Sequence, residues 1–168
     1  MNFRSLLKSS LLTAFLMCGV SQGWADPTQD ANGYYLLGSA SDLAWFANYV
    51  NSGNLSANAK VTADIDYTAY TVEANMIGQM YKRFAGIFDG QNHKITIAYN
   101  YGTTDGEESA GLFAYVSNAT IKNIYLSGTA ETSYDMSGAL VGHSFGNTTI
   151  SNVSCDVATN FRSSGNLT

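Results

Sequence analysis

The spacing of apolar residues predicts one helix near the start of the chain. Between positions 40 and 52 the apolar side chains recur at intervals of three and four, at Leu43, Phe46, Ala47 and Val50. This spacing places them on one face of an α-helix. Ser39 can cap the segment at its start, and Gly53 can end it. We therefore expect an amphipathic helix at about 40–52 that packs its apolar face on another element.

Beyond this helix the pattern is that of strands. Val61, Ala63 and Ile65 alternate with polar residues, which is the period of a strand with one buried face. The segment 34–37, just before the helix, is typical of a short strand. From residue 84 onward, short apolar segments alternate with turns rich in Gly, Asn, Ser and Thr. The pattern predicts β structure for nearly all of the chain after residue 59.

A glycine-centred motif recurs in the second half of the chain. Each copy consists of a small residue, a glycine and two further residues that are mostly apolar, and copies start at Ala85, Ala110 and Ser137, with a fourth at Ser164. The copies follow one another at a nearly constant interval, which is typical of stacked repeats. We assign structural roles in the repeat to Gly86, Gly111, Leu112, Phe113, Gly138, Leu140, Gly142, Asn123 and Asn152.

An apolar cluster follows each of the first three copies. The later two clusters share the order Ile-x-Asn-apolar, which puts Asn123 and Asn152 at equivalent places. Repeated asparagines at a corner can stack as a ladder of amides. In the first cluster, Ala98 follows Ile97 and no asparagine stands in the corner position. We expect an amide ladder between Asn123 and Asn152.

Together the repeats predict an all-β protein with the fold of a parallel β-helix. A turn of about 25–29 residues accommodates three short strands, and successive turns stack about 4.8 Å apart. The helix at 40–52 would cover the first turn, whose open edge would otherwise template aggregation. A β-sandwich is the alternative, since it buries similar patterns through hairpins. Sandwiches do not normally repeat one glycine motif at fixed spacing, and this favours the β-helix.

The segment 1–25 has the features of a secretory signal peptide. Arg4 and Lys8 precede an apolar run that is shorter than the roughly 20 residues of a membrane span. Small residues occupy the two positions that are read before a cleavage site after Ala25. Cys18 offers a lipoprotein alternative, but Phe15 and Met17 do not fit a lipidation site. The chain is therefore expected to be secreted or held at the cell surface.

The rest of the chain divides into two parts. The segment 26–33 is polar and aperiodic, and we assign it to a disordered leader. The segment 34–168 comprises the capping region and the first turns of the β-helix. No other apolar run approaches the length of a membrane span, so we expect no transmembrane helix after cleavage.

Charge and cysteine content narrow the possible partners. Removing Arg4 and Lys8 leaves 6 basic and 13 acidic residues, a net charge of −7. This balance argues against nucleic acid as a partner and disfavours anionic membranes. Cys155 is then the only cysteine, so no internal disulfide can form. It shares a strand face with Val153 and Val157, which predicts a buried thiol.

The glycine motifs resemble those of a known group of proteins. The sequences at 111–114 and 138–142 look like the GLUG motif of bacterial surface proteins. The arrangement from about residue 36 to 157 is similar to the N-terminal part of many secreted, adhesin-like, right-handed β-helix proteins. This resemblance implies a right-handed solenoid and a non-catalytic scaffold. It also implies that the motifs continue, so that the chain is truncated at Thr168.

Acidic residues and histidines are the first candidates for chemistry. Asp64 and Asp66 share one face of a strand, and Asp89 lies in a turn. Such carboxylates could bind calcium or act on a polysaccharide, but calcium requires six or more oxygens and no dense acidic loop is present. We therefore expect them to cap turns, and we expect no cofactor. His93 and His143 are expected in turns about two repeats apart, too far to share a metal.

Tyrosines are the better candidates for binding. Tyr99, Tyr101, Tyr115 and Tyr125 recur along the predicted turns, and outward rings at this spacing could pack against sugars. The resemblance adds extracellular proteins as possible partners. We therefore expect an exported, adhesin-like scaffold. The alternatives are a polysaccharide lyase or glycoside hydrolase on the same fold, and a spacer for a domain further along the chain.

Overall fold

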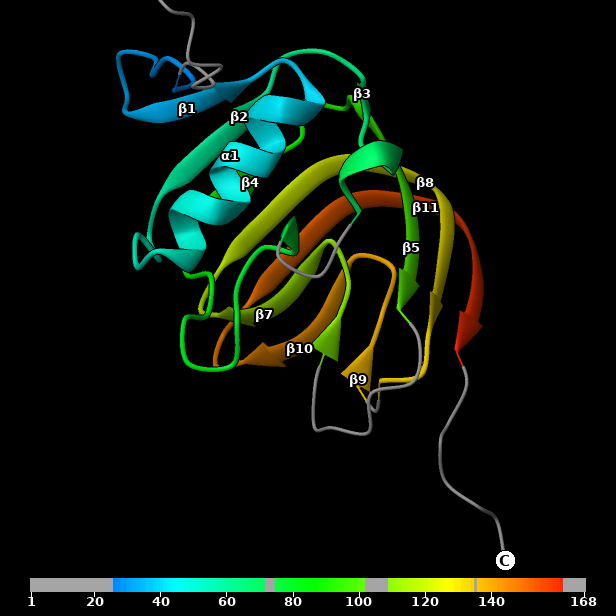
Figure 1. The fold of residues 1–168 in the computed structure, drawn as a ribbon. Helices are drawn as coiled ribbons and strands as arrows, with labels where there is room; N and C mark the ends of the chain where they lie inside the picture. Colours follow the sequence, from blue (N-terminus) through cyan, green and yellow to red (C-terminus); the bar gives the residue numbers. More distant parts are fainter. Residues whose placement is uncertain (1–25, 72–74, 102–108, 135, 162–168) are drawn as a thin grey trace, which may run out of the picture.

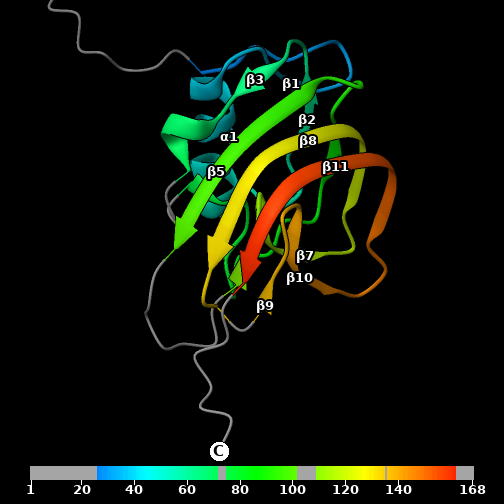
Figure 2. The ribbon, with the colours of Figure 1, turned by 90° about the vertical axis from the view of Figure 1, so that its right-hand side faces the viewer.

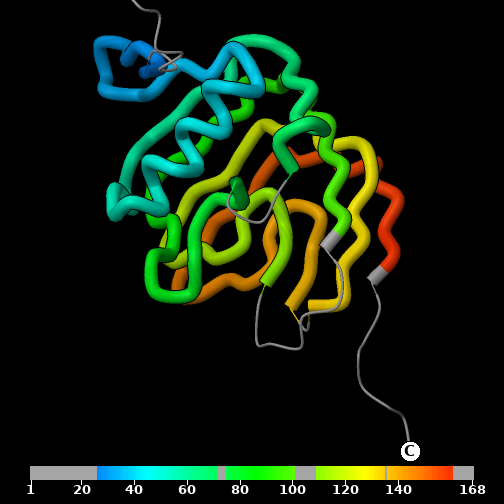
Figure 3. The backbone as a smooth tube through the Cα atoms, viewed as in Figure 1, coloured from blue at the N-terminus to red at the C-terminus, as the bar shows by residue number. Residues whose placement is uncertain are grey.

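The protein folds as a parallel β-solenoid of about three turns with one α-helix near its N-terminal end (Figure 1). The computed structural model describes residues 26–71, 75–101, 109–134 and 136–161. The backbone tube in Figure 3 winds through successive turns that lie beside one another. The predicted fold class is confirmed. The predicted signal peptide, its cleavage site after Ala25 and the motif copy at Ser164 lie outside the described residues.

Strands and a single α-helix make up most of the described chain, and the longest strands, β8 and β11, have 13 residues each. In chain order the elements are β1 (Tyr34–Leu37), α1 (Ala40–Asn51), β2 (Asn58–Val61), β3 (Ile65–Asp66), the 3-10 helix η1 (Thr68–Tyr70), β4 (Ile87–Asp89), β5 (Lys94–Tyr101), β6 (Ser109–Ala110), β7 (Phe113–Ser117), β8 (Thr120–Thr132), β9 (Met136–Ser137), β10 (Val141–Phe145) and β11 (Thr149–Phe161). Among the described residues, no helix has both the length and the apolar character needed to cross a membrane.

Parallel strand pairs form the sides of the solenoid. The largest sheet is centred on β8, which pairs with β4 along its first residues, with β5 along its later residues and with β11 along its other edge. Figure 2 shows β5, β8 and β11 as neighbouring curved strands. Two smaller sheets complete the turns, the pair β7–β10 and the pair β6–β9. All of these pairings are parallel, as a solenoid requires.

The offset between paired residues differs slightly from one sheet to the next. Ala110 pairs with Ser137 between β6 and β9, and Phe113 pairs with Val141 between β7 and β10. In the largest sheet, Thr120 pairs with Thr149. The number of residues that separates paired positions therefore grows by one from each sheet to the next. All three separations fall within the predicted repeat length of about 25–29 residues. Because a residue is inserted between sheets, a single fixed offset does not align the whole turn.

The pairing corrects the position of the first glycine motif. Ile87 pairs with Thr120, which sets Gly86 beside Ala119 and not beside Gly111. The partner of Phe113 in the preceding turn is Ile77. A Cβ atom on Gly86 would lie 2.1 Å from the carbonyl oxygen of Ala57, so a side chain cannot fit there. The copies look alike because each lies where backbones approach closely, but the first copy is on a different side of the solenoid from the copies at Ala110 and Ser137, which pair with each other.

Helix α1 covers the core at the first turn, as predicted. Ser39 caps it, because its hydroxyl accepts a hydrogen bond from the backbone N–H of Asp42 at 3.2 Å. The predicted apolar face is fully buried. The ring of Phe46 lies 6.0 Å from the rings of both Phe84 and Phe88, which come from the next turn. The helix thus takes the place of a further turn over the interior.

The segment 26–33 does not form the disordered leader that the sequence suggests. The carboxylate of Asp30 accepts hydrogen bonds from the backbone N–H groups of Asn32 and Tyr34, which closes a turn. The same carboxylate forms a 2.7 Å ion pair with Lys60 on β2. Further along, the N–H of Leu36 donates to the carbonyl oxygen of Thr28. These bonds order the segment against β1 and β2. They could not be predicted from the apolar pattern, because polar side chains and backbone groups form them.

The last described turn is open on one side, which corrects the prediction for Cys155. Cys155 pairs with Leu126, which is fully buried, yet Cys155 itself is exposed. Likewise Ile150 is 48% exposed, whereas its partner Ile121 is fully buried. Cys155 and Ile150 therefore lie on the inner face of β11, as predicted for Cys155. The difference arises because β11 has β8 on one side and no described strand on the other.

Asparagines form a ladder at one corner of the solenoid. The amide of Asn152 donates to the side-chain oxygen of Asn123 at 2.8 Å, as predicted. It also donates to Asn92 at 3.0 Å. Asn123 in turn donates to Asp89 at 2.8 Å. The register sets Asn92 beside Asn123, so the first turn does have a corner asparagine, and the prediction that it lacked one is wrong. Two additional residues in the first turn, Gly90 and Gln91, shift Asn92 away from the position that the repeat pattern predicts for the corner asparagine.

Candidate functional site

The three predicted acidic candidates each hold the local structure through hydrogen bonds: Asp66 and Asp89 bond residues of their own turns, whereas Asp64 bonds a residue of the next coil. Asp64 accepts a hydrogen bond from the backbone N–H of Lys94 at 2.9 Å, and Asp66 accepts from the hydroxyl of Thr68 at 2.7 Å. Asp89 is buried and accepts from the amide of Asn123 and from the backbone N–H of Gln91. Among the described residues, no three His, Cys, Asp or Glu side chains gather as a metal site would require.

The pKa values of these carboxyl groups are shifted in the direction that keeps them charged. The hydrogen bond from Lys94 lowers the pKa of Asp64, and the hydroxyl of Thr68 lowers that of Asp66. For Asp89, burial raises the pKa, but hydrogen bonds from Asn123 and Gln91 and the charge of Lys122 outweigh it, and the pKa is lowered. A general acid in glycoside hydrolysis needs a raised pKa. These three groups therefore do not suit the role of a general acid.

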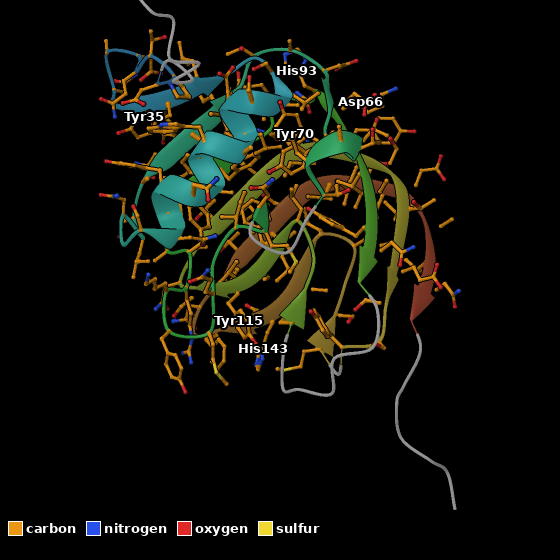
Figure 4. The ribbon with its side chains drawn as sticks, viewed as in Figure 1. Tyr35, Asp66, Tyr70, His93, Tyr115 and His143 are labelled. Carbon is orange, nitrogen blue, oxygen red and sulfur yellow. The ribbon has the colours of Figure 1, made fainter. Side chains whose placement is uncertain are left out.

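The two histidines occupy different environments. His93 follows a turn, as predicted, and its Nδ1 lies 3.3 Å from a carboxylate oxygen of Asp64. His143 lies within β10 and not in a turn, which corrects its predicted position. Its ring stacks on that of Phe145 with centroids 4.1 Å apart. Figure 4 shows His93 and His143 at opposite ends of the molecule, so they share no site.

Most of the tyrosine candidates do not form a stack on the outer surface. Tyr99 is 2% exposed and Tyr115 is 5% exposed. Tyr99 is buried because it continues the inward series of Ile95 and Ile97 along β5. Tyr125 is exposed on the outer face of β8. The side chain of Tyr101 lies outside the described part of the structure. The predicted column of surface tyrosines is therefore reduced to Tyr125 among those described.

A different group of aromatic side chains lies at the N-terminal cap. Tyr35 belongs to β1, and Trp45 and Tyr49 lie about one helical turn apart on α1. The rings of Trp45 and Tyr49 stack with centroids 4.7 Å apart, and the ring of Tyr35 lies 5.0 and 5.2 Å from them. The indole N–H of Trp45 donates to the carboxylate of Asp26 at 2.7 Å. All three rings belong to half-buried residues, so each keeps part of its surface accessible.

Two of these rings, those of Tyr35 and Tyr49, line a concave surface, which we call the cap groove. It has a volume of about 570 Å³ and is lined by Gln29, Gly33, Tyr35, Tyr49, Gly53, Asn54, Leu55, Ser56, Ala57 and Asn58. The size is within the range of small-molecule sites, about 300–1,000 Å³. Two aromatic rings together with amide and hydroxyl groups give the groove both apolar and hydrogen-bonding surface.

The polar side chains of the cap groove are held by the backbone. The amide of Asn54 donates to the carbonyl oxygen of Tyr49 at 3.1 Å, and that of Asn58 accepts from the backbone N–H of Ile87 at 2.8 Å. These bonds use one end of each amide. The opposite ends, the side-chain oxygen of Asn54 and the side-chain nitrogen of Asn58, have no partner among the described residues. A ligand in the groove could therefore find both an acceptor and a donor already positioned.

The phenol of Tyr35 stays neutral. A hydrogen bond with Tyr49, together with burial, raises the pKa of Tyr35 to about 12. The phenol therefore remains protonated across the physiological range and can take part only as a neutral hydrogen-bonding group. Sequence analysis missed this site because its residues are spread over β1, α1 and the loop after α1. The spacing of Trp45 and Tyr49, one helical turn apart beside the apolar face, was the available signal.

No family model, curated protein or solved structure matches the chain. The interpretation of the site therefore rests on its own residues and geometry.

Proposed function

We propose that this protein is an exported bacterial surface or secreted scaffold of the adhesin-like type, and that it binds a glycan in the cap groove. The cap groove is the observation that carries this proposal. Its paired aromatic rings suit the apolar face of a sugar ring, and its amides suit sugar hydroxyls. The export component rests on the N-terminal segment, and the adhesin component on the GLUG-like motifs at 111–114 and 138–142.

The chemistry of the groove favours a neutral sugar over a charged ligand. Its lining contains no Asp, Glu, Lys or Arg among the described residues. An apolar ligand would leave the free ends of Asn54 and Asn58 covered without partners, which costs free energy. A pyranose satisfies both requirements, because it offers C–H groups on one face and hydroxyls around its edge. The lowered pKa values of Asp64, Asp66 and Asp89 do not suit the general acid of a glycosidase, and none of the three lines the groove.

The proposal is tested on the exported product of the full-length gene. The product's mass locates the cleavage site, for which we expect an N-terminus at Asp26. A panel of neutral oligosaccharides is then titrated by calorimetry. We expect saturable binding of a subset, and a loss of about tenfold or more in affinity for Tyr49→Ala, since stacking contributes of the order of 1 kcal/mol beyond the area buried.

The control variant is Tyr125→Ala, which removes an exposed tyrosine on β8, outside the lining of the groove. We expect its affinity to equal that of the unmodified protein. Loss of binding in Tyr125→Ala but not in Tyr49→Ala would move the site to β8 and contradict the proposal. If no oligosaccharide of the panel binds, the result would favour a structural spacer. If new reducing ends form during incubation, the result would favour a glycosidase.

A further inference from the structure

A second hollow lies beyond the cap groove, between the loop before β4 and the corner after β7. It has a volume of about 380 Å³ and is lined by Leu55, Met80, Tyr81, Arg83, Ala85, Ser117 and Asn118. Unlike the cap groove, it contains a cationic side chain. We refer to it as the Arg83 hollow.

Arg83 is held in a fixed orientation. Its guanidinium carbon lies 3.4 Å from the centroid of the Phe145 ring, which places the guanidinium over the ring face. Its Nε donates to the carbonyl oxygen of Met80 at 3.0 Å. The ring of Phe145 is itself stacked on that of His143, and His143 on Tyr115. This column of rings supports the guanidinium from one side, and its two terminal nitrogens have no hydrogen-bond partner among the described residues.

The guanidinium also lacks an acidic partner in the described part of the chain. The ion pairs found there involve Lys60, His93 and Lys122, and none includes Arg83. This is notable because Asp and Glu outnumber Lys and Arg by 13 to 8 in the sequence. A stacked guanidinium with free terminal nitrogens is suited to binding a carboxylate through two parallel hydrogen bonds.

The rest of the hollow has the composition of a sugar subsite. Tyr81 is 88% exposed and offers an aromatic face, and Ser117 and Asn118 provide polar groups. Leu55 lines both this hollow and the cap groove, so the two surfaces adjoin. We propose that the Arg83 hollow binds the carboxylate of an acidic sugar, a uronic or sialic acid. This inference rests on the proposed glycan-binding function and specifies part of its ligand.

Acidic sugars and their neutral esters provide the test. The exported protein is titrated with trigalacturonate, a glucuronate-containing disaccharide and sialyllactose, each beside its methyl ester. The ester keeps the ring and removes the charge. We expect at least one acid to bind about tenfold or more tightly than its ester, because charge-assisted bidentate bonds are strong. Arg83→Gln should abolish this difference, and Arg83→Lys should restore only part of it.

Lys82→Gln is the matched control, since it removes the same charge from the adjacent, exposed residue. We expect it to keep the preference for the acid. Equal losses in Lys82→Gln and Arg83→Gln would indicate general electrostatic attraction and overturn the proposal, as would equal affinities for every acid and its ester. Binding of a neutral sugar to Arg83→Gln tests the cap groove independently of the Arg83 hollow. If the neutral sugar still binds while no protein variant prefers an acid over its ester, carboxylate binding in the Arg83 hollow is rejected and glycan binding in the cap groove is retained.

Discussion

Five residues other than glycine adopt a left-handed backbone conformation in the described chain, and four of them are asparagines: Gln91, Asn92, Asn118, Asn123 and Asn152. Asparagine tolerates this conformation better than most residues, because its short side chain can hydrogen-bond locally. Each asparagine here also has a side-chain bond to a neighbouring turn or loop. At the scale of single residues, these positions therefore serve both the backbone bend and the contact between turns.

The carboxyl group of Asp89 should make stability depend on pH. Its folded-state pKa is lowered from the ordinary value of 3.8, so its contribution is present above that value and is lost as the pH falls through the lower, folded-state pKa. We expect Asp89→Asn to be destabilised at neutral pH, and the gap to narrow below pH 3.8. Urea unfolding from neutral to acidic pH measures the difference in free energy of unfolding between the unmodified protein and Asp89→Asn. An equal difference at neutral pH and below pH 3.8 would mean that the charge of Asp89 is not the cause.

At the scale of elements, the corners join strands that sequence patterns treat separately. Strand β8 runs through the corner at Asn123 and pairs with β4 before it and β5 after it. The amide ladder holds this corner in register with the turns on either side. The stability of the corner therefore depends on both the backbone conformation and the side-chain bonds of Asn123.

Substitutions at Asn123 separate these two contributions. Asn123→Ala loses the ladder bonds and also strains the backbone at φ 56°, with an expected cost of about 2–4 kcal/mol in the free energy of unfolding. Asn123→Gly loses the bonds alone and should cost about half as much. Gln91→Gly is the control, since Gln91 has a positive φ of 51° but is exposed and outside the ladder; we expect a change within about 0.5 kcal/mol. Equal costs for the Ala and Gly variants at 123 would refute the role of backbone strain.

Much of this element-level structure could be predicted from the sequence. The apolar spacing of α1, its cap at Ser39 and the strand β1 follow from local chemistry, and the glycine period indicates the solenoid. The register could not be derived in the same way. Gly86 resembles Gly111 in its local sequence, but only the pairing of Ile87 with Thr120 shows that they lie on different sides. The cap groove was missed because its aromatic rings meet only after β1 and α1 have packed together.

At the scale of the whole molecule, the two ends of the solenoid differ. Helix α1 covers the first turn, whereas the inner positions of β11 are half-buried or exposed. The cap groove and the Arg83 hollow adjoin at Leu55, in the loop that follows α1. The molecule thus has two concave surfaces near its capped end, and at the other end a strand, β11, that pairs only with β8 among the described residues.

The exposed side chains of β11, whose outer edge has no partner among the described residues, predict self-association. An exposed strand edge with apolar side chains favours pairing between chains. We expect the protein to show concentration-dependent assembly by analytical ultracentrifugation, with a reductant present so that Cys155 cannot form disulfides. Ile150→Lys should reduce assembly, whereas Tyr125→Lys, on the outer face of β8, should not. A monomer at every concentration would contradict this view of β11.

The central claim is that the cap groove binds a glycan, and the emission of Trp45 tests it most directly. Cleavage after Ala25 would leave Trp45 as the only tryptophan, and its ring stacks on that of Tyr49, which lines the groove. The account predicts a saturable change in Trp45 emission on addition of the neutral sugar retained in calorimetry, with the same affinity, and no change in Tyr49→Ala. Binding detected by calorimetry without any response of Trp45 would contradict the account, because the sugar would then occupy another surface.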